Sequence, residues 1–214
     1  MHVRKPAAMQ MTRAWSALSV AVVVAAALPA VAADDGAALS AKVDQAIGAA
    51  ASYHVTVNGP GLLLDILEVG HDRLRVQSTV GGTTTESVVV GTAMYYHGPN
   101  SPWAAAAVPP VKRPRKNLLY MAAPDSKLEP LPDRAENGVT YGAFGSLALG
   151  NGGVPATMEC TYDKATFLPH ACTVVMQSLS TPLRVVYDRW NDAANVVEAP
   201  PGVAPPTPAP SPGP

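Results

Sequence analysis

The sequence predicts a mainly β protein built around an antiparallel sheet, with one helix near its N-terminus. From residue 52 onward, short stretches of alternating apolar and polar residues follow one another closely, which is the pattern of half-buried strands. Turn-forming Gly, Pro, Asn and Asp residues separate these stretches, as expected for strands joined by tight hairpins. The chain also holds 22 Pro and 17 Gly among 214 residues, a composition that argues against a helical protein.

The first 33 residues have the order of an export signal. Three basic residues precede an uncharged apolar run over 17–27, and small residues stand before Asp34, so we expect signal cleavage after Ala33. The run is shorter than the ~20 residues that a membrane-spanning helix needs, which disfavours the alternative of a retained anchor. A lipid anchor would need a Cys at the cleavage point, and the first Cys is Cys160. The sequence therefore predicts an exported protein, periplasmic or secreted.

The charge and length of the exported part restrict its class. Residues 34–214 hold 12 basic and 16 acidic side chains, a net charge of −4, so nucleic acid is a poor candidate partner. We expect one β-rich domain over 34–199, a size typical of a single domain. Residues 200–214 are rich in Pro and carry no charge, which predicts a disordered, extended tail. A passive spacer is favoured over a docking peptide, and a monomer is expected.

Each element follows from the local pattern. Residues 37–50 are rich in Ala, with apolar residues at roughly helical spacing, and predict a short helix. After it, turn residues delimit five strands, and a Pro-rich loop at 98–102 then leads to Trp103. Six Pro within 104–134 exclude a long helix there, although 118–121 could form one turn. The strands are predicted at 52–57, 62–69, 73–79, 83–90, 93–97, 127–131, 138–144, 156–162, 169–176, 183–187 and 195–198.

Two cysteines flank the hairpin expected between residues 156 and 176. Counting outward from a turn at Asp163–Thr166 places Cys160 opposite Cys172, on one face of the two strands. A structural disulfide is the favoured interpretation, and it suits an oxidising compartment. A redox pair normally has the spacing Cys-x-x-Cys, and a metal site would need more ligands than His170.

Catalytic and cofactor signatures are absent from the sequence. His54, His71, His97 and His170 are scattered, and none shares helical metal-site spacing with another. There is no Gly-x-Ser-x-Gly turn and no nucleotide-binding glycine motif. We expect each histidine to be a surface residue, and the protein to be no enzyme and to hold no cofactor or metal.

One dense cluster of positive charge lies in the Pro-rich middle of the chain. It consists of Lys112, Arg113, Arg115 and Lys116, and an apolar stretch at 118–121 follows it. A solvated loop is the favoured interpretation. The alternative is a basic and apolar flap that makes transient contact with an anionic membrane surface.

The layout resembles the LolA-like and LppX/LprG-type exported lipoprotein-carrier superfamily over about residues 37–200. The chain departs from this pattern in lacking a lipobox and in having a Cys pair and a Pro-rich tail. The segments that carry the resemblance are Ser52–Val57, Asp72–Val76, Glu86 to Tyr96, Pro102-Trp103, the hairpin Asp163-Lys164-Ala165-Thr166-Phe167-Leu168-Pro169, and Tyr187 to Pro200.

The resemblance implies a strongly curved antiparallel sheet, an open half-barrel, with helix and loop cover over an apolar concave side. It also implies a carrier of a lipid or other hydrophobic molecule in the cell envelope. Two alternatives stay open: an envelope structural or interaction protein of the same fold without a ligand, and a hydrolase with a dispersed site. Candidate ligand-lining residues, taken from one face of each strand, are Val55, Leu64, Ile66, Leu74, Val76, Val88, Val90, Met94 and Tyr96.

Overall fold

The computed structural model describes residues 36–70, 72–108, 127–148 and 156–206. All of them belong to one compact unit, Ala33–Pro214. Within these ranges, no helix is both long enough and apolar enough to cross a membrane. The regular elements of the described residues are α1 (Gly36–Ala49), β1 (Ser52–Gly59), β2 (Leu62–Val69), β3 (Arg73–Val80), β4 (Thr83–Val90), β5 (Ala93–His97), β6 (Ala104–Ala107), β7 (Glu129–Glu136), β8 (Val139–Ala148), β9 (Ala156–Tyr162), β10 (Pro169–Met176) and β11 (Leu183–Asp188).

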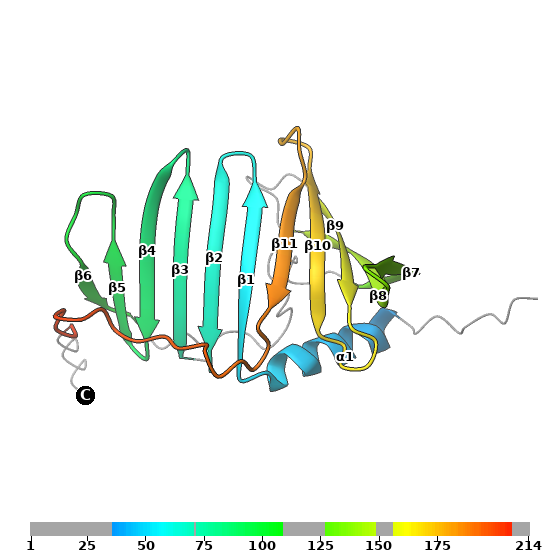
Figure 1. The fold of residues 1–214 in the computed structure, drawn as a ribbon, viewed down its shortest axis with the longest axis horizontal. Helices are drawn as coiled ribbons and strands as arrows, with labels where there is room; N and C mark the ends of the chain where they lie inside the picture. Colours follow the sequence, from blue (N-terminus) through cyan, green and yellow to red (C-terminus); the bar gives the residue numbers. More distant parts are fainter. Residues whose placement is uncertain (1–35, 71, 109–126, 149–155, 207–214) are drawn as a thin grey trace, which may run out of the picture. The chain divides into compact units, whose positions relative to one another are not determined.

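The eleven strands form a single antiparallel sheet that does not close, which confirms the predicted fold class. Its order is β6-β5-β4-β3-β2-β1-β11-β10-β9-β8-β7. The sheet therefore consists of two meanders, β1–β6 and β7–β11, that meet only where β1 pairs with β11, here called the central pairing. In Figure 1, β1–β5 are seen face on and β7 and β8 nearly end on, so the sheet curves strongly, as in an open half-barrel.

Two-residue turns fix the register of the first meander. Gly59 faces Leu62, and Val80 faces Thr83, so only two residues connect each of these strand pairs. Gly81 and Gly82 both have positive φ, as a tight hairpin turn between twisted strands requires. Such short connections allow only antiparallel neighbours, which is why this meander could be predicted strand by strand from β1 to β5.

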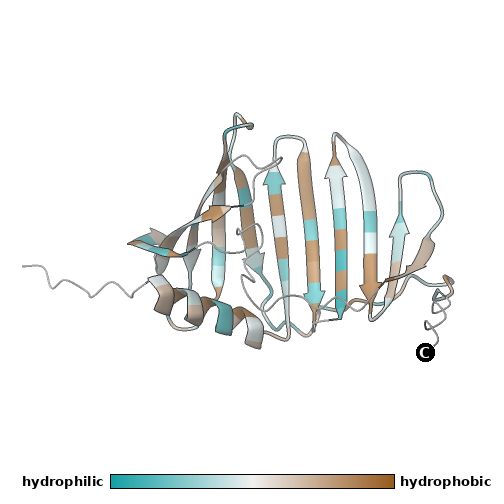
Figure 2. Cartoon of the chain, turned by 180° about the vertical axis from the view of Figure 1, so that it is seen from behind, coloured by the Kyte–Doolittle hydropathy of each residue, from teal (hydrophilic) through white to brown (hydrophobic). Residues whose placement is uncertain are grey.

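The register divides the sheet into two faces. The helix face carries Val55, Phe144 and Tyr187, which are buried in one cluster with Leu39, Val43 and Ile47 of α1. The opposite face, called the outer face, carries the residues that alternate with them, such as His54. Figure 2 shows this alternation as hydrophobic and hydrophilic bands along β1–β4.

The C-terminal segment, residues 189–203, covers part of the outer face. In Figure 1 it runs along the strand ends from β11 toward β5. Val197 is buried there with Leu67, Val88 and Tyr95, and Val203 packs against the same cluster. The prediction of a strand at 195–198 is wrong, because a segment that runs across strand ends cannot align its backbone with a ladder. Val203 also shows that packed chain continues past residue 200.

Both edge strands differ from the prediction. β6 is made of four alanines, which do not predict a strand because Ala favours helix over strand. β7 extends to Glu136 instead of ending at residue 131. It contains Pro130 and Pro132, which an edge strand tolerates because one side of its backbone needs no ladder partner.

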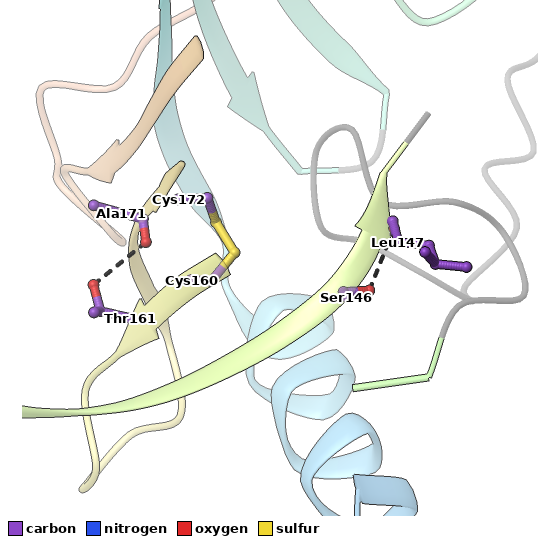
Figure 3. The surroundings of a disulfide bond; sticks show 6 residues. All are labelled: Ser146, Leu147, Cys160, Thr161, Ala171 and Cys172. Carbon is purple, nitrogen blue, oxygen red and sulfur yellow. Dashed lines mark hydrogen bonds between the residues drawn. A yellow bond between two sulfur atoms is a disulfide. The ribbon is translucent and has the colours of Figure 1, made fainter. Parts of the chain in front are cut away.

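The disulfide prediction is confirmed. Cys160 of β9 faces Cys172 of β10, and the two are bonded. Figure 3 shows the bond beside a second link between the strands, in which the Thr161 hydroxyl donates to the Ala171 carbonyl at 3.3 Å. Both cysteines are 2 % exposed, so the bond lies inside the core, where it supports packing and is shielded from redox partners.

Candidate functional site

The candidate site is the helix face of β2–β5. Cross-strand pairing aligns one row of side chains across it: Val55, Ile66, Val76, Ser87 and Tyr96. A second, parallel row consists of Tyr53, Glu68, Leu74, Val89 and Met94. Side chains that face each other directly on one face lie close enough to touch, so the two rows form a continuous, mostly apolar surface.

The structure brings together seven of the nine predicted lining residues. They share the helix face and are Val55, Leu64, Ile66, Leu74, Val76, Met94 and Tyr96. Val88 and Val90 lie on the outer face, where they pack with the C-terminal segment. In the run Val88-Val89-Val90 both faces of β4 are apolar, so alternation could not show which valines face the helix. The residue missed there is Val89.

Exposure on the helix face rises with distance from α1. Val55 and Ile66 are buried, Leu74, Val76, Val89 and Met94 are half-buried, and Tyr96 is 48 % exposed. The described residues thus bury Val55 of β1 and Ile66 of β2 but leave an apolar surface on β3–β5 in partial contact with water. Removing apolar surface from water is favourable by about 25 cal/mol per Å². Binding of an apolar molecule that covers this surface would therefore be favourable.

The polar groups of this surface are few and mostly uncharged. Among the described residues of β2–β5, Glu68 is the only charged side chain on the helix face. Glu68 is 7 % exposed, and the Tyr53 hydroxyl donates a 2.7 Å hydrogen bond to it, which offsets the cost of burying the carboxylate. Hydroxyls line the other end of β3 and β4, at Ser78, Thr83 and Thr85.

The described residues offer no metal centre. None of their His, Cys, Asp and Glu side chains forms a group of three or more that could hold a metal ion. His97 lies against Trp103, with ring centroids 5.2 Å apart, and His170 stacks on Tyr141 at 4.5 Å. The expectation that every histidine is a surface residue is wrong for His54, which is 7 % exposed.

Several sequence-based predictions lie outside the described residues. These are the export signal with its cleavage point after Ala33, the basic cluster at Lys112, Arg113, Arg115 and Lys116, the helical turn at 118–121, His71, and the end of the tail from 207 to 214. They stay predictions.

Comparisons with known proteins were made at three levels. No family model matches the chain, and no curated protein matches it in sequence. Among solved structures, lipoprotein LppX of Mycobacterium tuberculosis aligns with a TM-score of 0.48 and 16% identity, over 76% of this chain and 100% of that one. A LolA superfamily protein of Nitrosomonas europaea aligns with a TM-score of 0.32 and 9% identity, over 72% of this chain and 91% of that one.

A third solved structure is an outer-membrane lipoprotein-sorting domain of Vibrio parahaemolyticus. It aligns with a TM-score of 0.28 and 11% identity, over 72% of this chain and 91% of that one. The likeness to LolA and LppX proteins that the sequence indicated is therefore confirmed as a likeness. Each TM-score is below 0.5, so ligand and activity have to be inferred from the residues of this chain.

Proposed function

We propose that this chain is an exported, non-enzymatic binding or carrier protein for a lipid or another hydrophobic molecule of the cell envelope. The helix face of β2–β5 is the proposed binding surface. The observation that carries the proposal is the gradient on this face, from the buried Val55 to the half-buried Val76 and Met94 and the exposed Tyr96. An extended apolar surface rimmed by polar residues is typical of a binding site.

The chemistry of the surface supports an apolar ligand over a charged one. The described part of the site offers Leu, Val, Met and Tyr side chains and a few hydroxyls. Its single carboxylate, Glu68, already accepts a hydrogen bond from Tyr53. An acyl chain or a similar hydrocarbon would gain by burial here, whereas a charged group would lose hydration without gaining an ionic partner. Export is supported by the pattern of residues 1–33.

Native mass spectrometry tests whether a ligand is bound. Protein purified gently from its own host should carry a bound hydrophobic molecule, visible as an added mass that organic solvent extracts. Bare protein would instead favour the alternative of an envelope interaction protein with the same fold.

Probe binding locates the site. A fluorescent fatty acid should bind with a roughly micromolar dissociation constant, near −8 kcal/mol. Val76→Trp places a bulky ring on the helix face and should weaken binding at least about tenfold, a change of 1.4 kcal/mol. Gln77→Trp is the matched control, because the next residue of β3 is exposed on the outer face, and it should bind like the parent. Equal binding by both variants would remove the helix face from the proposal.

A further inference from the structure

His54 occupies an unusual position on the outer face of β1. It is 7 % exposed, and its ring lies between two carboxylates on the neighbouring strands. Its Nδ1 is 2.6 Å from Oδ1 of Asp188 in β11, and its Nε2 is 2.8 Å from Oδ2 of Asp65 in β2. Both distances are those of strong, charge-assisted hydrogen bonds.

The number of protons on the ring follows from these contacts. An ionised carboxylate only accepts hydrogen bonds, and a neutral imidazole donates from one nitrogen and accepts at the other. A neutral ring would therefore place an acceptor against an acceptor at one of the two contacts. The imidazolium form donates at both nitrogens and satisfies both carboxylates.

The charges around His54 favour the same protonation state. On β3, Nη2 of Arg75 is 3.5 Å from Asp65, and on β4, Glu86 is 4.0 Å from Arg75. Beyond β11, Nε of Arg189 is 3.7 Å from Asp188. The three carboxylates contribute three negative charges and the two arginines contribute two positive charges. The net charge of the group is therefore zero only if His54 carries a positive charge. Arg184 of β11 lies on the same face, opposite Asn58 of β1, four residues along from His54.

The location of His54 makes this contact a link between two parts of the sheet. Asp65 belongs to the first meander and Asp188 to the second, and among the described strands the central pairing of β1 with β11 is the one backbone ladder between the two meanders. Figure 1 shows these two strands side by side in the middle of the sheet. We infer that the His54 imidazolium is a protonation-dependent clip that holds the two meanders together.

The direction of the pH effect follows from which form is bonded. The charged ring makes both hydrogen bonds, so its contribution is complete while the proton is held and is lost as pH rises through the deprotonation of His54. Loss of the proton leaves Asp65 and Asp188 facing a ring that can donate to only one of them. The central pairing should then open more readily, whether or not the protein binds a ligand.

The role is structural because neither ring nitrogen is available for other chemistry. Both are engaged by carboxylates at hydrogen-bond distance, so the ring has no lone pair with which to act as a general base. A metal role is disfavoured too, since the described residues hold no group of three or more ligands.

The first test uses the unaltered protein labelled with ¹⁵N-histidine. The His54 ring should show two protonated nitrogens at the acidic end of the pH range in which the protein stays folded, and raising the pH should remove one of those protons. The melting temperature should fall by about 4 °C over the same pH interval. A His54 ring with a single proton at that acidic end, or a fall in melting temperature at an unrelated pH, overturns the inference.

The second test measures hydrogen exchange in the central pairing. Corrected for the intrinsic effect of pH, protection of the Thr56 and Val186 amides, which pair across β1 and β11, should decrease on deprotonation of His54, while protection in the β3–β4 ladder should not. His54→Gln should remove this difference. His97→Gln is the matched control, since His97 lies on the outer face of β5 and outside the central pairing, and it should keep the difference. Equal pH responses in the two variants overturn the clip.

Discussion

The most deeply buried side chains of β8–β11 and of β3–β5 lie on opposite faces of the sheet. In β8–β11 the helix face is buried against α1, as at Phe144, Val174 and Val185, each 0 % exposed. The outer face of the same strands carries exposed Leu147 and Val175. In β3–β5 the outer face is buried where the C-terminal segment covers it, as at Val88 and Tyr95, while the helix face is only partly covered.

The difference shows that apolar surface stays accessible where no helix or segment packs on the sheet, more than where strand composition alone would place it. One short helix packs on the helix face of the second meander but reaches only the first strands of the other. A separate, extended segment stabilises the outer side of β2–β5, so these strands can remain folded while their helix face stays available. The second meander is a packed core, and the first offers the proposed binding surface.

The largest expected effect is a core truncation in the packed meander. Phe144→Ala should lower the free energy of unfolding by about 3–5 kcal/mol, because it removes a fully buried ring and leaves a cavity. Met94→Ala on the open helix face should cost only about 1 kcal/mol, since that side chain is already partly in water. Urea denaturation of both variants measures the contrast. Similar losses for the two would mean that the helix face of β5 is a packed core as well.

The disulfide should contribute next. Cys160→Ser with Cys172→Ser should lower the free energy of unfolding by about 3 kcal/mol, since the bond closes a loop with a sequence separation of 12. The bond lies between β9 and β10 of the second meander, so probe binding on the helix face of β3–β5 should persist in the folded variant. Thermal melting and probe titration check the two parts. A variant that folds but no longer binds would show that the two meanders are coupled.

A smaller effect tests the cover of the outer face. Val197→Ala should cost about 2 kcal/mol, because Val197 is 2 % exposed beneath Leu67, Val88 and Tyr95. Val196→Ala is the matched control: Val196 is 54 % exposed, so this change should alter stability by about 0.5 kcal/mol or less. Chemical denaturation of the pair reports the difference. If both variants behave alike, the C-terminal segment does not stabilise the first meander.

The smallest effect is a pH dependence at the β9–β10 turn. The Thr166 and Ala165 amides and the Thr166 hydroxyl donate to Oδ1 of Asp163, and these bonds, the Thr166 amide foremost, lower the pKa of Asp163 below its ordinary 3.8. The unfolded chain therefore takes up the proton first, so this stability is present above about pH 4 and is lost as pH falls below it.

The size of this effect is limited because Asp163 is largely exposed and water screens its interactions, which keeps the contribution below about 1 kcal/mol. Asp163→Asn should be less stable than the parent at pH 6 and should lose less stability on acidification. Melting curves at pH 6 and pH 3 measure both. A parallel acid response in parent and variant would assign the acid sensitivity to other carboxylates.

Particular elements show how far the sequence could be used to predict the fold. The limits of β2, β4, β5, β9 and β10 were predicted to the residue, because Gly turns or Cys register bound each of them. The strand β6 was missed because Ala104–Ala107 has no strand propensity of its own, and it pairs only because β5 offers its edge. The clip at His54 was missed because its two carboxylates are 11 and 134 residues away in the sequence.

By itself, the sequence determined the local structure: the order of strands β1–β5, the hairpin turns and the pairing of Cys160 with Cys172. These depend on neighbouring residues and on the two-residue period of a strand. Only the tertiary structure decided which face each meander buries. The run Val88-Val89-Val90 is apolar on both faces, and its covering partner, Val197, is distant in the chain. Burial depends on what packs against a strand, and alternation alone cannot specify that partner.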